Sequence, residues 1–396
     1  MFFVGFVVNK VDIIIFGGGI AGLWTLNRLL KLGYSAVLLE SKGLGGVQTI
    51  ASQGIIHGGT KYALTGSLSD SAKQIGAMPG RWRDCLQGHG ELDLSDVPIN
   101  AEHQYLWSTE SLASKLTGFF AGKVMQSRML SVKPADGPKL FNTPAFKGSL
   151  YRLDEPVLDV PGLAASLVNQ AQGNCYQLSE EEWQPLAEGD GIRLANSETI
   201  EAKSIVLTSG AGNQGLLQRF GRTAPVMQRR PLHMPIARGE LPALFAHCLG
   251  VSANPRITIT SHRDDAGRTV WNIGGQPAES GNNLDFEMQI ETTRNELTTV
   301  LPWVDFSEVQ WSAYRVDRAE ISQPGGKRPD SCHVSADDGI ITAWPTKLAF
   351  APLLADQVIN AIQESGIDPS HSPANPLPLN SAPMSRPPWE TIERWI

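Results

Sequence analysis

The stretch from Val11 to Gly22, VDIIIFGGGIAG, decides the fold of this chain. Its first half is apolar and rich in isoleucine, which is typical of a buried parallel strand. The run then passes through Gly17-x-Gly19-x-x-Gly22 into leucines that recur at helical spacing. In this pattern the first glycine permits a tight turn, the second lets backbone approach a pyrophosphate, and the third lets the helix pack closely on the strand. The stretch therefore predicts a strand–turn–helix unit that binds a dinucleotide.

The residues around this turn indicate how the dinucleotide is held. The helix N-terminus, which begins with Ile20 and Ala21, presents free N–H groups and a partial positive charge to the phosphates. The next apolar run ends at Glu40, near the position where this fold places the acid that binds an adenosine ribose, and Ser41 follows it. An acid in place of an arginine favours FAD or NAD over NADP. The alternative without a ligand is an empty α/β turn.

The composition suits an ordinary globular enzyme. The chain has 396 residues, 41% of them hydrophobic and 18% charged, which is ample for a large core and two domains. A net charge of −7 gives no electrostatic reason to expect nucleic acid. The four cysteines show no C-x-x-C spacing, so we expect a reducing cytoplasm with neither disulfides nor a zinc site. The apolar residues 1–8 are too short to span a membrane, and we expect no transmembrane helix.

The rest of the chain divides between two kinds of sheet. Buried-strand runs return at residues 205–208 and 339–344, the second before a helical pattern that ends near residue 362. Residues 256–260 and 270–273 are rich in β-branched and aromatic side chains, with polar and apolar residues alternating in the first run, and they lie on either side of a turn, as in antiparallel hairpins. We expect an α/β fold in which a Rossmann-like nucleotide-binding domain receives an inserted antiparallel-sheet substrate domain of α+β type.

The expected boundaries follow from these patterns. The nucleotide-binding domain comprises residues 10–100, 151–224 and 311–366, the substrate domain comprises residues 101–150 and 225–310, and a Pro-rich tail, wrapped on the surface or disordered, comprises residues 367–396.

The loop after Glu40 narrows the choice of cofactor from FAD or NAD to FAD. Residues 52–68 read SQGIIHGGTKYALTGSL, and here the chain resembles the D-amino-acid-oxidase-like superfamily of FAD-dependent oxidoreductases. The whole run is similar to L-2-hydroxyglutarate dehydrogenases and oxidases, and its core, residues 56–59, to FAD-dependent glycerol-3-phosphate dehydrogenases. The resemblance implies that the Rossmann-like domain is an FAD-binding domain.

Further segments extend the resemblance over residues 10–362. Residues 154–159 are similar to the start of the helix that precedes the adenine-side strand in this family, and residues 209–212 to its second glycine turn at the FAD. Residues 311–315 resemble the late segment that places an arginine over the flavin. Residues 346–352 resemble the loop beside the flavin pyrimidine.

The chain also departs from the family pattern. Arg315 is followed by valine where members usually have proline, and residues 344–346 replace a glycine-rich stretch. The last segment lacks the cysteine that ties FAD covalently in the amine-oxidising branch. Noncovalent FAD is therefore favoured, with His57 as the alternative point of attachment.

The glycine pattern and the resemblance together imply cofactor-binding residues in five segments. They are Gly17, Gly19, Ile20, Ala21, Gly22, Glu40, Ser41, Ser52, Gly54, His57, Gly58, Gly59, Gly210, Ala211, Gly212, Thr346, Lys347 and Leu348. Backbone without side chains at Gly58 and Gly59 can pass close to an isoalloxazine ring.

Three residues are candidates for catalysis, and each has a simpler alternative. His57 can act as a base, because an imidazole titrates near neutral pH, or it can be a structural histidine that binds FAD or a neighbouring loop. Arg315 can bind a substrate carboxylate through two hydrogen bonds, or it can pair with a nearby acid. Lys347 can place positive charge near the reduced flavin N1 or activate oxygen, or it can be solvated. Tyr62 can line the substrate pocket, although aromatic residues in strands more often belong to the core.

These residues predict an FAD-dependent oxidoreductase that oxidises a small carboxylate-bearing 2-hydroxy acid, or an amino acid or amine, by hydride transfer to flavin N5. Oxygen, a quinone or an electron carrier would accept the electrons. The alternatives are an NAD(P)H-dependent FAD monooxygenase and a flavoprotein subunit of an electron-transfer complex, docked through Trp389, Trp395 and Ile396. The spacing of the histidines matches no metal motif, so no metal is expected.

Overall fold

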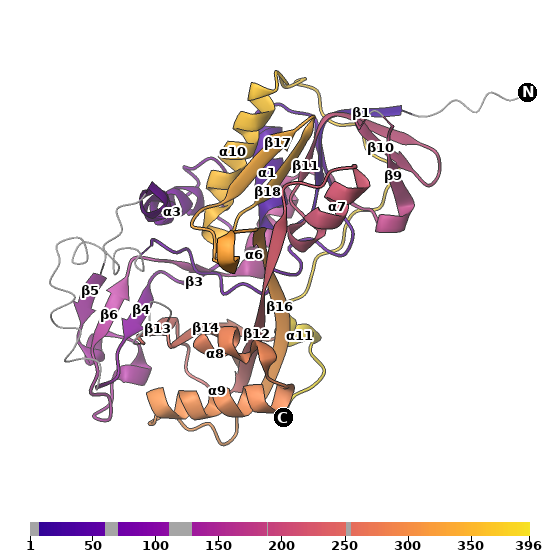
Figure 1. Ribbon diagram of the computed structural model, residues 1–396. Helices are drawn as coiled ribbons and strands as arrows, with labels where there is room; N and C mark the ends of the chain where they lie inside the picture. Colours follow the sequence, from indigo (N-terminus) through magenta and orange to yellow (C-terminus); the bar gives the residue numbers. More distant parts are fainter. Residues whose placement is uncertain (1–7, 60–69, 111–128, 188, 251–254) are drawn as a thin grey trace, which may run out of the picture.

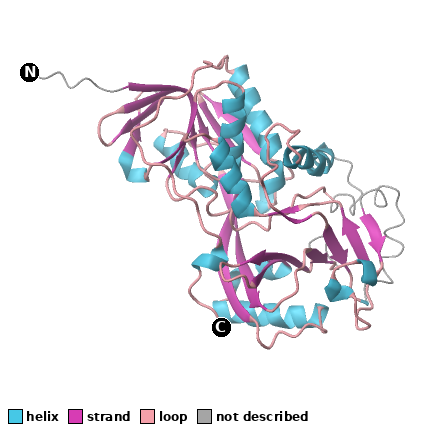
Figure 2. Cartoon of the chain, turned by 180° about the vertical axis from the view of Figure 1, so that it is seen from behind, coloured by secondary structure: helices cyan, strands magenta, loops and turns pink. Residues whose placement is uncertain are grey.

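The computed structural model describes residues 8–59, 70–110, 129–187, 189–250 and 255–396. These residues form two large sheets, one above the other in Figure 1, and the long strands β12 and β16 of the lower sheet reach up toward the upper one. The view from behind in Figure 2 shows a helix running beneath the lower sheet, on the side away from the upper sheet. Tyr62 and residues 1–7 lie outside the described residues. In the part of the chain that is described, no helix is long and apolar enough to cross a membrane.

The upper sheet has the order β17-β18-β11-β1-β2-β8, with β10 and β9 attached to β11. Strand β1 pairs in parallel with β11 on one side and β2 on the other. Ile13, Ile14 and Ile15 of β1 are completely buried, because alternate side chains enter hydrophobic clusters on opposite faces. The strands are β1 (Val8–Phe16), β2 (Ala36–Glu40), β8 (Cys175–Gln177), β9 (Trp183–Pro185), β10 (Gly191–Leu194), β11 (Thr199–Leu207), β17 (His333–Asp337) and β18 (Ile340–Trp344).

Helices cover this sheet as a Rossmann-like arrangement requires. They are α1 (Ile20–Lys31), α3 (Asp70–Leu86), α6 (Val160–Gln170), α7 (Asn213–Arg219) and α10 (Ala351–Glu364). Helix α1 follows β1 through the glycine turn, and β2 follows α1, as the opening stretch predicts. Helix α6 begins at its cap Asp159, whose carboxylate accepts a hydrogen bond from Gly162 N at 2.8 Å, and leads to β8 beside β2.

The lower sheet has the order β16-β12-β15-β14-β13-β4-β6-β5 and is antiparallel except for the parallel pair β13–β4. The hairpin expected at residues 256–273 is present as β14 and β15. Helix α9 packs one face through a cluster that includes Trp271 and Trp311. The elements are β4 (Gln104–Trp107), β5 (Met129–Val132), β6 (Leu150–Leu153), β12 (Met227–Gly239), β13 (Ala246–Cys248), β14 (Ile257–Arg263), β15 (Thr269–Gly275), α8 (Gln276–Ser280), α9 (Phe286–Val300) and β16 (Gln310–Ile321), and the short pair β3 (Ile99–Ala101) and β7 (Val157–Leu158) lies apart.

The predicted fold class is confirmed, with a mostly parallel sheet and a mostly antiparallel one. The division of the chain between them differs at two strands. β16, assigned from sequence to the nucleotide-binding segment 311–366, pairs along its whole length with β12 of the lower sheet. β6, which overlaps the start of segment 151–224, pairs with β4 and β5 in the same sheet. Both segments begin with a strand of the lower sheet and then return to the upper one.

The C-terminal tail, residues 367–396, wraps on the surface and contacts both sheets. In the upper half, Met384 and Ser381 form β-bridges with Leu44 and Tyr176. In the lower half, the tail forms the short helix α11 (Pro388–Thr391), and Trp389 is only 4% exposed. The Trp389 indole stacks on His262 with the ring centres 4.3 Å apart. Of the three residues that suggested an external partner, Trp389 is therefore buried on its own chain, whereas Trp395 is half-buried and Ile396 is 53% exposed.

Replacing Trp389 by alanine is expected to lower the free energy of unfolding by about 3–5 kcal/mol, because it empties a buried aromatic site. The midpoint of urea unfolding, followed by far-UV circular dichroism, measures the change. Glu393→Ala, an exposed position in the same tail, is the matched control and is expected to stay within about 0.5 kcal/mol. Equal midpoints for both variants and the parent would contradict a docked tail.

Candidate active site

The glycine turn lies at the carboxyl edge of the upper sheet, where β1 has β11 on one side and β2 on the other. This is the switch point at which open α/β sheets bind ligands. Gly17 adopts a φ of 104°, a conformation that favours glycine. A Cβ atom at Gly22 would lie 2.0 Å from the carbonyl oxygen of Gly17, so helix α1 can approach the strand only with glycine there. The cap residue Gly19 provides no side-chain hydrogen bond to the helix, although Ile20 N donates to Thr49 Oγ1 at 3.0 Å. The positive end of the α1 dipole at this edge suits an anion.

Glu40 ends β2 beside this turn. Its Oε2 accepts a hydrogen bond from Gly18 N at 2.6 Å, and its Oε1 accepts from Lys42 N at 2.7 Å. The carboxylate therefore joins the glycine turn to the following loop, at the edge where a dinucleotide would lie. A role for Glu40 and Ser41 at the ribose stays a prediction.

The second glycine turn and the last loop meet at the same edge. Residues 210–212 form a 3₁₀ turn after β11, and Gly210 O accepts a hydrogen bond from the Trp344 indole at 3.0 Å. Thr346, which follows β18, has a φ of 58° and is 4% exposed. A β-branched residue seldom adopts this conformation, which glycine adopts readily. The turn therefore keeps a glycine-like backbone where the family has a glycine-rich stretch, and it carries Lys347 and Leu348 behind it.

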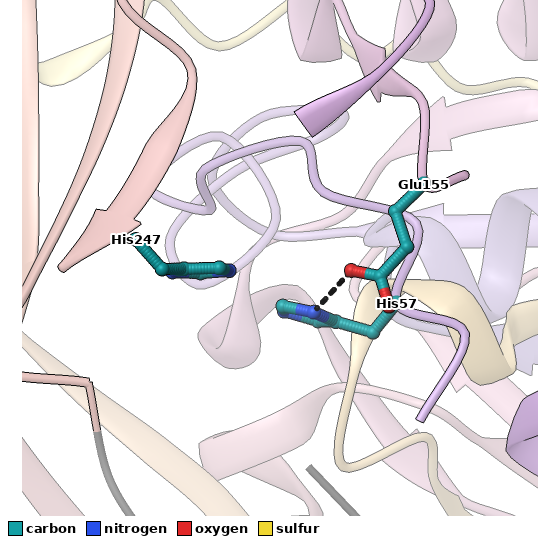
Figure 3. Close-up of side chains that lie close together, drawn as sticks. All are labelled: His57, Glu155 and His247. Carbon is teal, nitrogen blue, oxygen red and sulfur yellow. Dashed lines mark ion pairs between the residues drawn. The ribbon is translucent and has the colours of Figure 1, made fainter. Parts of the chain in front are cut away.

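The loop after β2 brings His57 to a buried carboxylate from a distant segment. Its Nδ1 lies 3.5 Å from Oε2 of Glu155, in the turn between β6 and β7, and the other oxygen, Oε1, accepts a hydrogen bond from Gly58 N at 2.8 Å. The His247 ring, from β13, lies nearly parallel to His57, with the ring centres 6.0 Å apart. Figure 3 shows the His57 ring placed between Glu155 and His247. His247 Nδ1 is in turn 2.7 Å from Thr258 Oγ1.

The charges in this cluster follow from burial and pairing. Burial alone would raise the pKa of the Glu155 carboxyl, but the hydrogen bond and charge of His57 and the Gly58 N–H outweigh it, so the pKa is lowered and the group is ionised at neutral pH. Burial, with repulsion from His57, lowers the pKa of His247 to about 3, which leaves His247 uncharged at neutral pH. The cluster therefore combines a buried carboxylate with one half-exposed and one buried imidazole.

The register of the lower sheet decides which side chains can reach this cluster. Tyr314 of β16 faces the loop, since its hydroxyl donates to Ala51 O and to Asn272 Oδ1, each at 3.2 Å. Neighbouring residues of a strand face opposite sides, so Arg315 points to the α9 side. There its guanidinium donates to the carbonyl oxygens of Asn282 and Leu284, both at 2.7 Å. Arg315, the expected anchor for a substrate carboxylate, thus lies on the face of the sheet opposite Tyr314 and the loop of Ala51.

Glu155 and His247 are the members of the cluster that the sequence did not single out for catalysis. Glu155 lies in a segment that resembled the family, yet only as a helix start. His247 was one of several histidines without a recognisable spacing. Residues 57, 155 and 247 meet through pairing between distant segments, and no local pattern in the sequence signals that contact.

Comparisons with known proteins show the family of this chain. Residues 12–351 match the family described as "DAO: FAD dependent oxidoreductase". The chain belongs to this family. It is 46% identical over 385 residues to the "Probable FAD-dependent oxidoreductase PA4991" of Pseudomonas aeruginosa, covering 96% of this chain and 98% of that protein. The crystal structure of PA4991 superposes with a TM-score of 0.83 over 96% of this chain and 98% of that one, at 41% identity.

Glycine oxidase from Geobacillus kaustophilus shares the fold, with a TM-score of 0.61 at 15% identity over 90% of this chain and 95% of that chain. The protein is thus an FAD-dependent oxidoreductase, and FAD is its cofactor. The glycine turn, the α1 N-terminus and the edge loops provide a site of suitable chemistry. Within the described residues, Ser52 Oγ and Asn272 Nδ2 are also buried without a hydrogen-bond partner, next to the Ala51–Tyr314 contact, so both atoms are suited to bind a polar group of a ligand.

Replacing Gly22 by alanine is expected to reduce the FAD content of purified protein at least tenfold, because the new Cβ would collide with Gly17 O and push α1 away from the turn. The ratio of flavin to protein absorbance measures this. Gly215→Ala in α7, where a Cβ would meet nothing within 4 Å, is the matched control and should keep its FAD. Normal FAD content in Gly22→Ala would contradict the assignment of the turn.

Replacing Arg315 by alanine is expected to reduce stability by about 1–3 kcal/mol, because two carbonyl groups lose a charged donor. The concentration of substrate that half-saturates flavin reduction should change less than twofold. Urea unfolding and anaerobic flavin reduction measure the two effects. A tenfold rise in the half-saturating concentration would restore Arg315 as the carboxylate anchor.

Proposed function

We propose that the enzyme oxidises a carbon atom bearing a hydroxyl or amino group in a small 2-hydroxy acid or amino compound, with His57 as the base. The observation that supports this most is the pairing of His57 with the buried carboxylate of Glu155. FAD, when bound, supplies the hydride acceptor, N5 of the flavin. The chain itself must then remove the proton from O–H or N–H and hold the substrate in place.

The pair is built for proton transfer. Glu155 holds the Nδ1 side of the His57 ring, which directs Nε2 away from the carboxylate. An imidazole that accepts a substrate proton becomes positively charged, and the carboxylate 3.5 Å away stabilises that charge. The His57 side chain is 40% exposed, so a small substrate can reach it, whereas Glu155 is shielded from water. The uncharged ring of His247 bounds the other side of the imidazole.

Among the candidate substrates we favour a 2-hydroxy acid. A neutral amine can lose hydride from its α-carbon to give an iminium ion without losing an N–H proton. An alcohol must lose its O–H proton to become a carbonyl, so its oxidation gains more from a positioned base. The resemblance of residues 52–68 to L-2-hydroxyglutarate dehydrogenases and oxidases agrees with this choice. With Arg315 on the opposite face, Lys347 in the loop after β18 is the cation that we assign to negative charge at the flavin or on the substrate.

We infer that FAD is bound without a covalent link, because no cysteine lies in the last loop and His57 is engaged with Glu155. For a subunit of an electron-transfer complex, the docked tail removes Trp389 as a docking residue, since it is buried against this chain, and leaves Ile396 exposed. An NAD(P)H-dependent monooxygenase is tested by the rate of NAD(P)H oxidation, which we expect to be negligible.

Under anaerobic conditions a 2-hydroxy acid is expected to bleach the flavin absorbance. His57→Gln should slow that bleaching by about 10²–10⁴-fold, the usual contribution of a general base. Glu155→Gln should also slow the bleaching, because the cationic imidazole loses its counter-charge. Stopped-flow absorbance with a panel of hydroxy acids, amino acids and N-methyl amines provides the measurement.

His89→Gln, an exposed histidine in the turn after α3, is the control and should react like the parent. Bleaching of His57→Gln at the parent rate would remove the base assignment. Bleaching by amines alone would replace the hydroxyl substrate, and rapid NAD(P)H oxidation would favour a monooxygenase. Flavin that precipitates with the protein in acid would show a covalent link.

A further inference from the structure

The His57–Glu155–His247 cluster also has the composition of a metal site. One donor atom from each side chain lies within 4.8 Å of the other two. Glu155 and His247 are buried, at 3% and 8% exposure, whereas the His57 side chain is 40% exposed. Figure 3 shows that the three side chains come from separate segments and converge. The cluster thus has two ligands inside the protein and one on its accessible side.

Hydrogen bonds outside the cluster already hold the two buried ligands. Thr258 Oγ1 lies 2.7 Å from His247 Nδ1, and in the tautomer in which Nδ1 donates, Nε2 carries the free lone pair. Gly58 N donates to one oxygen of Glu155 at 2.8 Å and leaves the other directed to His57. Metal-binding histidines and carboxylates are typically oriented by such outer hydrogen bonds.

Two imidazole nitrogens and one carboxylate oxygen suit a divalent transition metal. Calcium and magnesium prefer ligand sets made of oxygen, whereas zinc accepts two histidines and a glutamate and leaves a fourth position open. Zinc bonds of about 2.0–2.2 Å place neighbouring ligand atoms roughly 3.3–3.5 Å apart. The widest separation in the present cluster, up to 4.8 Å, would have to shrink by about 1.3–1.5 Å. The half-exposed His57 side chain, on its loop, can make that movement.

We propose that His57, Glu155 and His247 bind one divalent metal ion of the zinc type, and that this ion inhibits the enzyme. Inhibition follows because a neutral imidazole that binds the metal through Nδ1, the nitrogen facing Glu155, carries its own proton on Nε2 and cannot accept another there, and Glu155 no longer stabilises a cationic imidazole. The inhibition rests on the proposed function of His57. The binding of the metal does not, because it requires the three side chains alone.

Equilibrium dialysis of the flavin-loaded protein against ZnCl₂, after removal of metals with a chelator, tests the site without any substrate. Elemental analysis is expected to find one zinc ion per chain in the parent. His247→Gln and Glu155→Gln each remove a ligand and should abolish this binding. Thr258→Val removes only the hydrogen bond to His247 and should weaken zinc binding by about 10–100-fold.

His89→Gln keeps all three ligands and should bind zinc like the parent. Unchanged flavin content and circular dichroism show that each variant is folded. Equal zinc binding by the parent and by His247→Gln, or no binding by the parent, would overturn the metal site. Zinc that binds at the site but leaves substrate-driven flavin bleaching unchanged would overturn the inhibition. A protein that no hydroxy acid or amine reduces would argue against the proposed function, while dialysis would still decide the metal site.

Discussion

The site depends on how the buried carboxylate of Glu155 is compensated by hydrogen bonds and opposite charge. An ionised group inside a protein costs several kcal/mol unless hydrogen bonds and opposite charge compensate for it. Glu155 meets this requirement through Gly58 N–H and His57, both from the loop after β2. The same loop pairs with the segment that follows Glu155, through the bridge from Ile55 to Val157. Compensation of the Glu155 charge thereby holds the loop after β2 in place between the two sheets.

The alternation of side chains in the lower sheet determines the rest of the site. In β16, Tyr314 and Arg315 are neighbours in sequence, yet Tyr314 contacts the loop after β2, and Arg315 contacts backbone in and just after η6, the 3₁₀ turn Gly281–Asn283. A shift of one residue in strand register would exchange their faces. The sequence around Arg315 resembles the family, but resemblance of a segment does not reveal which face each residue occupies. The pairing with β12 settles that question.

What could be predicted from the sequence was local. The run from β1 to β2 has its own turn chemistry and periodicity, so strand, glycine turn and helix were all foreseeable. The hairpin β14–β15 was foreseeable for the same reason. The contact of His57 with Glu155 and His247 was not, because it depends on pairing between segments far apart in the chain. Thr346 illustrates the same limit, since its glycine-like φ follows from the loop around it and contradicts the preference of a β-branched residue.

The C-terminal tail forms no core element of its own, yet its contacts reach the glycine turn of the cofactor site. Ser385 packs against Gly43 and Gly46, where added Cβ atoms would lie 2.6 and 2.7 Å from its hydroxyl oxygen. Between those glycines, Leu44 packs so close to Gly18 that a Cβ there would lie 2.6 Å from the leucine side chain. Contacts thus run without a break from the tail to the dinucleotide turn. Because the same tail is secured to the lower sheet by Trp389, the position of that turn depends on both sheets together.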